Sequence, residues 1–127
     1  KTSMMRKTSD QIIQKAKTYI SYHLHSIITL SGISKEIGLS PAYFSAFFKK
    51  ETGQPLISYI HQERISEAKE LLKYTDYSCT WIANALVFSS QSHFSSIFRK
   101  VAGITPGEYR RKWIRDEGTN TSISTSE

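Results

Sequence analysis

The sequence predicts an all-α fold in which two copies of a short helical unit flank one long helix. Residues 55–74 carry apolar side chains on a 3.6-residue period along one face and charged or amide side chains along the other, which is typical of an amphipathic helix. The segments on either side of this stretch resemble each other. No stretch shows the alternation of apolar and polar residues that predicts a half-buried strand.

The internal repeat determines the predicted domain organisation. Two copies are too few for a solenoid, so they indicate duplication of a small binding unit. Before the predicted turn the offset is 49 residues, so that Ile33 corresponds to Ile82. After it the offset is 50 residues, and the matching pairs are Phe44 and Phe94, Phe48 and Phe98, Lys49 and Arg99, Lys50 and Lys100, Gly53 and Gly103, and Tyr59 and Tyr109.

The first lobe is predicted to occupy residues 10–54, after a polar segment, residues 1–9, that is expected to be disordered or to fray. Ser9 or Asp10 is the expected N-cap of a helix that runs to about residue 23. A short helix follows from its cap Thr29 to residue 37, and Gly38 supplies the left-handed residue that ends it.

A second helix is predicted from the cap Ser40 and the first-turn proline Pro41 to about residue 51, which completes a helix-turn-helix. A phenylalanine stripe by itself indicates only a core, and a lysine pair by itself indicates only a solvated face. On this helix the residues expected to face inward are Phe44, Phe47 and Phe48, and those expected to face outward are Ala42, Ser45, Ala46, Lys49 and Lys50.

Residues 55–74 form the predicted central linker helix, with Pro55 in its first turn and Ile57 within its apolar arc. At 1.5 Å per residue this helix would span about 30 Å. Arg64 also lies within the apolar arc. A guanidinium there needs a partner, so an ion pair or carbonyl contact inside the protein is the favoured interpretation.

The second lobe is predicted over residues 75–116. Ser78 caps a helix over residues 79–86, and Ser89 or Ser90 caps the next one, which ends near residue 102. Thr105 and Glu108 form a capping box for a last helix, and residues 117–127 are expected to be a disordered tail. On the helix before the capping box, the residues expected to face inward are Phe94, Ile97, Phe98 and Val101.

Composition narrows the class of partner. A net charge of +6 over 127 residues suits a polyanion, although many soluble domains are mildly basic. The single cysteine, Cys79, excludes an internal disulfide and fits a reducing cytoplasm. No apolar run approaches the length of a membrane span, and no signal peptide is visible. Because the chain starts at Lys1 without an initiator methionine, we expect it to be a piece of a longer protein.

An enzyme is the first alternative that the residues allow. His23 and His25 have H-x-H spacing, but no zinc-protease motif, cysteine cluster, nucleophile elbow or phosphate loop is present. We therefore expect no catalytic residue, no metal site and no cofactor.

Four ordered blocks resemble the AraC/XylS family of bacterial transcription regulators: ITL, GLSPAYFSAFFKKETG, RISEAKELLKYTDYS and FSSQSHFSSIFRKVAGITPGEYR. The resemblance covers residues 12–113. It implies seven helices in two homeodomain-like helix-turn-helix lobes, and sequence-specific binding of double-stranded promoter DNA with one recognition helix per lobe in successive major grooves. It also implies a sensor or receiver domain in the full-length protein. RNA polymerase is a candidate further partner, since regulators can dock proteins as well as DNA.

The resemblance implies two sets of DNA-contacting residues. Arginine is frequent in the family where Ala46 and Ser96 stand, so direct base readout is expected to be weaker here and to lean on DNA shape. The base-reading positions fall on Ala42, Ser45, Ala46, Gln91, Ser92 and Ser96. The phosphate-facing candidates are Lys49, Lys50, Arg99, Lys100, Arg110 and Arg111.

Three further residues depart from the family pattern. Val87 stands where the turn glycine is usual, so the second turn is expected to be either strained or rebuilt. Trp81 replaces an acidic capping partner, and Ser34 replaces a small apolar residue.

The second alternative function is a protein-interaction module that docks RNA polymerase or a partner regulatory domain and binds DNA weakly.

Overall fold

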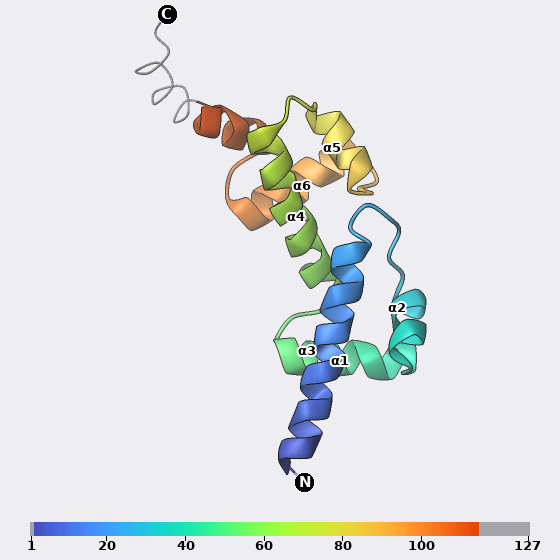
Figure 1. Ribbon diagram of the computed structural model, residues 1–127. Coiled ribbons are helices and arrows are strands. Elements are labelled where there is room, and N and C mark those ends of the chain that lie inside the picture. Colours follow the sequence, from blue (N-terminus) through green and yellow to red (C-terminus); the bar gives the residue numbers. More distant parts are fainter. Residues whose placement is uncertain (1, 115–127) are drawn as a thin grey trace, which may run out of the picture. The chain divides into compact units, whose positions relative to one another are not determined.

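The computed structural model of the protein describes residues 2–114, with side chains from Thr8 onward. Over these residues the chain forms helices and no strand, which confirms the predicted fold class (Figure 1). It divides into two compact units, residues 1–63 and 64–127, and the division falls inside α4. The predicted tail, residues 117–127, lies outside the described residues. The helices are α1 Thr2–Tyr22, α2 Leu30–Ile37, α3 Pro41–Thr52, α4 Leu56–Tyr74, α5 Cys79–Ala85, α6 Gln91–Ala102 and a seventh over residues 106–114.

Helix α1 begins earlier than its sequence signals indicated. The predicted start at Ser9 or Asp10 is wrong, because the helix is already formed at Thr2. The intervening residues include methionine, arginine and lysine, which favour helix, and no glycine or proline interrupts them. A capping residue inside a run of helix formers does not by itself start a helix.

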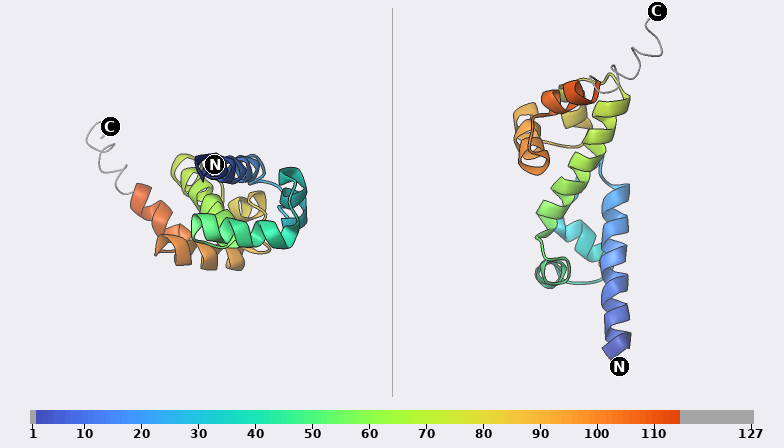
Figure 2. Two further views of the ribbon diagram at one scale, coloured as in Figure 1. Left: turned by 90° about the horizontal axis from the view of Figure 1, so that it is seen from below. Right: turned by 90° about the vertical axis from the view of Figure 1, so that its left-hand side faces the viewer.

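In the first unit α2 and α3 pack against α1 (Figures 1 and 2). Both predicted caps are present: Thr29 accepts a hydrogen bond from the Gly32 N–H at 2.9 Å, and Ser40 accepts one from the Tyr43 N–H at 3.3 Å. Gly38 has a φ of 91° and closes α2 in the left-handed conformation. The predicted helix-turn-helix is therefore confirmed in this unit.

The core of the first unit is built around two phenylalanines of α3. Phe44 and Phe48 are fully buried, with ring centroids 5.9 Å apart, and Phe48 meets Tyr59 edge-on at 5.5 Å. The prediction that Phe47 also faces the core is only partly right. Phe47 is half-buried and stacks on the exposed Tyr43 at 6.1 Å, because the buried stripe of α3 is one residue wide.

The central helix differs from its prediction in two places. Pro55 lies just before α4, where its carbonyl accepts the Tyr59 N–H at 3.1 Å, so that it occupies the cap position rather than the first turn. Ile57, expected in the apolar arc, is 58% exposed at the edge of a shallow hollow. Arg64 is buried, as its place in the arc indicated. Desolvation lowers its pKa, and it takes part in an interaction within the protein.

In the second unit α5 packs against α6, and Phe94 and Phe98 repeat the buried pair with centroids 5.8 Å apart. The predicted capping box is confirmed: the Thr105 N–H donates to Glu108 Oε1 at 2.8 Å, and the Glu108 N–H donates to Thr105 Oγ1 at 3.1 Å. Val101 was expected to face inward but is 42% exposed, since it lies in the last turn of α6 at the margin of the Phe94–Phe98 stripe.

The two turns share a left-handed residue and one backbone hydrogen bond, although the Gly38 N–H donates to the Ser34 carbonyl and the Val87 N–H to the Asn84 carbonyl. The Leu39 N–H donates to the Ser34 carbonyl at 3.0 Å around Gly38, and the Phe88 N–H donates to the Ala83 carbonyl at 2.9 Å around Val87. Val87 has a φ of 63°, the left-handed conformation that β-branched residues rarely adopt. The second turn therefore keeps the left-handed conformation with a valine in place of the glycine.

Replacing Val87 should reveal this strain. Val87→Gly should raise the melting temperature, because a residue held in a sparsely populated conformation costs on the order of 1–3 kcal/mol. Val87→Ala is the control, since it removes the same side chain at a position where an L residue remains strained, and it should melt below the wild type. A Val87→Gly protein that melts lower than the wild type in a thermal scan would mean that the half-buried valine side chain outweighs the strain.

The first unit contains a buried hydroxyl group that is expected to lower its stability. Ser34 is 1% exposed, and its hydroxyl has no hydrogen-bond partner among the residues that the structure describes. Its counterpart in the second unit is Ala83, also fully buried. Ser34→Ala should therefore stabilise the protein by about 1 kcal/mol, because an unsatisfied buried hydroxyl costs about 1–3 kcal/mol. The reverse change, Ala83→Ser, should destabilise by a similar amount. Urea denaturation measures both, and a loss of stability in Ser34→Ala would contradict the argument.

Candidate nucleic-acid interface

The outward face of α3 consists of short side chains followed by cations. Because Phe44 and Phe48 point inward, Ala42 and Ala46 are exposed and Ser45 is half-buried. Lys49 and Lys50 are exposed in the last turn. This face offers a close approach to a flat or grooved surface, with positive charge at one end.

Helix α6 presents a similar face in the second unit. Gln91, Ser92 and Ser96 are exposed, and Arg99 and Lys100 are exposed in the last turn. Each helix thus combines small polar or methyl groups in its first turns with two cations in its last turn. The cations also lie near the C-terminal carbonyls of their helices, where positive charge stabilises the helix dipole.

Arg110, a predicted phosphate contact, donates hydrogen bonds to two backbone carbonyls within the second unit. Its Nε donates to the Leu72 carbonyl at 3.1 Å, and its Nη2 donates to the Thr75 carbonyl at 3.0 Å. These carbonyls lie at the C-terminal end of α4, so Arg110 caps that helix. Arg111 is exposed. No local feature of the sequence distinguishes these adjacent arginines, because the partners of Arg110 lie more than thirty residues away along the chain.

Two further side chains beside the predicted face were missed. Tyr43 is 59% exposed and, with Ala46 and Lys50 of α3 and Ser9 of α1, lines a hollow of about 340 Å³. Thr80 on α5 donates its hydroxyl hydrogen to Gln91 Oε1 at 2.5 Å. A helical period of three and four residues links Tyr43 to Ala46 and Lys50 and could have indicated the first. No local signal indicates the second, since it joins residues eleven apart across the turn.

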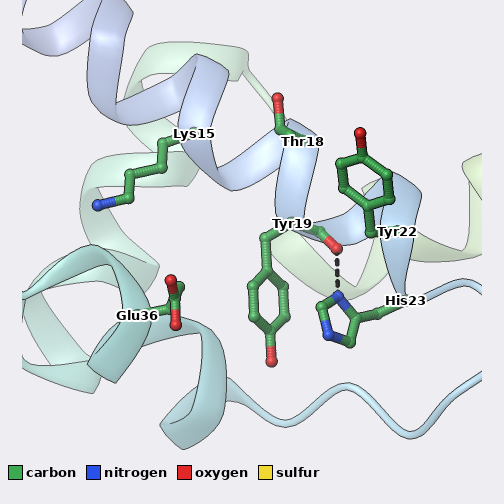
Figure 3. Close-up of a pocket in the computed structure, with 6 residues that line it drawn as sticks. All are labelled: Lys15, Thr18, Tyr19, Tyr22, His23 and Glu36. Atoms are coloured by element: carbon green, nitrogen blue, oxygen red, sulfur yellow. Dashed lines mark hydrogen bonds between the residues drawn. The ribbon is translucent and has the colours of Figure 1, made fainter.

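A separate hollow of about 510 Å³ lies on α1 and α2, and it bears on the enzyme alternative. Figure 3 shows Tyr19 and His23 side by side there, with rings stacked at 4.0 Å and His23 Nδ1 2.7 Å from the Tyr19 carbonyl oxygen. Lys15 and Glu36 line its other side.

Within residues 2–114 no three His, Cys, Asp or Glu side chains gather in a way that could hold a metal ion. None of the described helices is both long and apolar enough to cross a membrane.

A family model described as a helix-turn-helix domain matches residues 33–112. The chain is 32% identical to the arabinose operon regulatory protein of Escherichia coli over 102 residues, which are 80% of this chain and 35% of that protein. It is 36% identical to the regulatory protein PocR of Salmonella typhimurium, over 88% of this chain and 37% of PocR. It is 31% identical to the transposon Tn10 TetD protein of Escherichia coli, over 84% of this chain and 77% of that one.

Solved structures agree with these sequence matches. The C-terminal domain of AraT, a response regulator from Geobacillus stearothermophilus, superposes with a TM-score of 0.75 at 32% identity, over 80% of this chain and 84% of that one. The DNA-binding domain of AdpA, solved with a target DNA, has the same fold, with a TM-score of 0.76 at 23% identity over 82% of this chain and 94% of that one. The chain therefore belongs to the AraC-type helix-turn-helix family of transcription regulators, and it is a DNA-binding domain of that type.

Proposed function

We propose that this domain binds promoter DNA sequence-specifically, with α3 and α6 as recognition helices that enter successive major grooves. One observation carries the proposal: each of these helices buries a phenylalanine pair and turns short side chains and two cations outward. A recognition helix needs small groups where its backbone approaches base edges and positive charge where it passes the phosphates.

The proposed contacts divide into two classes. Phosphate contacts are expected from Lys49, Lys50, Arg99, Lys100 and Arg111. Arg110 is left out because its guanidinium is held by two backbone carbonyls. Phosphate contacts set position and affinity, whereas base-edge contacts set sequence preference. Base-edge contacts are expected from Ala42, Ser45, Ala46, Gln91, Ser92 and Ser96.

The domain is further proposed to act in the cytoplasm as the DNA-binding part of a larger regulator. The chain spans only 37% of PocR and 35% of the arabinose operon regulatory protein. AraT is described as a response regulator whose C-terminal domain has this fold. A sensor or receiver domain elsewhere in the full-length protein, and contact with RNA polymerase at the promoter, are the partners we propose. A module that only docks proteins is the alternative, and salt dependence separates the two.

Binding to duplex DNA should weaken steeply with salt. Five phosphate contacts would release enough counterions to give a slope of about −4.5 in a plot of log K against log salt concentration. Fluorescence anisotropy with a labelled duplex measures the slope. A slope near zero would remove DNA as the partner and favour the protein-docking alternative.

Two substitutions should distinguish phosphate contacts from base-edge contacts. Lys50→Ala should weaken binding to every duplex alike and reduce the magnitude of the salt slope by about one, because it removes one phosphate contact. Gln91→Ala should mainly relax the choice of base at one or two positions. Lys15→Ala is the control, an exposed lysine on α1 outside the proposed face, and it should change neither quantity. Equal effects of Lys50→Ala and Gln91→Ala on all sequences would contradict the division.

A further inference from the structure

The side chain of Gln91 is held by a neighbour that belongs to a different helix. Thr80 lies in the first turn of α5, and its hydroxyl donates to Gln91 Oε1 at 2.5 Å. Gln91 is the first residue of α6, where a recognition helix meets base edges. Both side chains are exposed, so this hydrogen bond lies at the surface and not in the core.

The hydrogen bond determines which end of the Gln91 amide is available. A glutamine amide has a carbonyl oxygen that accepts and an NH₂ group that donates. With Oε1 turned to Thr80 on α5, the NH₂ group is the end left to face a ligand. In the major groove guanine presents two acceptors, N7 and O6, whereas adenine presents the acceptor N7 beside the N6 donor. A fixed donor therefore matches guanine, and a freely rotating amide suits adenine through paired contacts to N6 and N7.

Gln91 has the longest reach of the residues proposed to contact base edges. The other five proposed base-reading residues are alanines and serines, so Gln91 is the longest side chain among them. The arrangement is confined to the second unit, because the counterparts of Thr80 and Gln91 in the first unit are Ser31 and Pro41. Holding Gln91 in one orientation before DNA arrives also reduces the rotamer entropy that binding would otherwise remove.

We infer that Thr80 is a positioning residue for base recognition: its hydroxyl orients Gln91 so that the amide NH₂ reads guanine in preference to adenine. This inference rests on the proposed function. Thr80 itself need not touch DNA, and its effect is on which base is chosen and not on how tightly all DNA is held.

The test uses the 127-residue chain and a duplex selected by it from a random library. Single base-pair variants of that duplex locate the position whose preference Gln91→Ala relaxes. At that position the ratio of dissociation constants for adenine and guanine is measured for the wild type, Thr80→Ser and Thr80→Val. Ser31→Ala, the matching site in the first unit, is the control.

The wild type and Thr80→Ser should prefer guanine by about tenfold, equivalent to about 1.4 kcal/mol. Thr80→Val, which keeps the shape and loses the hydroxyl, should bring the ratio near one or shift it toward adenine. Its salt slope and its affinity for unrelated duplex should stay at wild-type values, which a purely structural role of Thr80 would not predict. Ser31→Ala should leave the ratio unchanged. If Thr80→Val melts lower than the wild type, Thr80→Ala takes its place.

Two results would overturn the inference while leaving the proposed function intact: a Thr80→Val protein with the wild-type ratio, or a wild type that prefers adenine at the position Gln91 reads. A wild type that selects no sequence and shows no salt dependence would instead overturn the proposed function. The two failures are thus distinguishable.

Discussion

The burial of two phenylalanines one turn apart in each recognition helix is the constraint on which the rest of the structure depends. Phe44 and Phe48 in α3, and Phe94 and Phe98 in α6, have no exposed surface. Full burial of one such side chain is worth about 1.5–3 kcal/mol, so the four together are comparable to the whole stability of a small domain. Because they fix the rotation of each helix about its axis, they also fix which residues face outward. The outward face can then vary in sequence without changing the fold.

Each of the two repeated units carries one unfavourable residue, and the other unit has a favourable residue at the matching position. The first unit has the glycine that its turn geometry requires, but its buried Ser34 hydroxyl has no hydrogen-bond partner within the described part of the chain. The second has Ala83 at the matching position but holds Val87 at a φ of 63°. Each unit contains the residue that the other lacks. Both units nevertheless keep a left-handed residue at the turn and the backbone hydrogen bond across it, although each carries one residue that we expect to cost stability.

The sequence alone predicted correctly those features that depend on residues close together in the chain. Thr29, Ser40 and Ser78 cap their helices because a hydroxyl before a helix satisfies a free N–H group. It failed where the outcome depends on distant neighbours: Ile57 and Val101 have apolar side chains that remain exposed, and Arg110 is held by carbonyls contributed by another helix. The outward residues of α3 and α6 followed from helical period alone. The link from Thr80 to Gln91 did not, since it crosses a turn that periodicity does not describe.

The composition of the outward faces determines how specificity is divided. Alanine at positions 42 and 46 allows only apolar contact with thymine methyl groups, and serine reaches few base atoms. In the proposed binding mode, direct hydrogen-bonded readout is therefore concentrated on one amide in the second unit, and most of the binding free energy is expected from cations that contact every sequence alike. Under these conditions the deformability of the DNA contributes a larger share of the discrimination between sites. We therefore expect such a domain to read a few bases by direct contact and the remainder of its site through the free-energy cost of deforming the duplex.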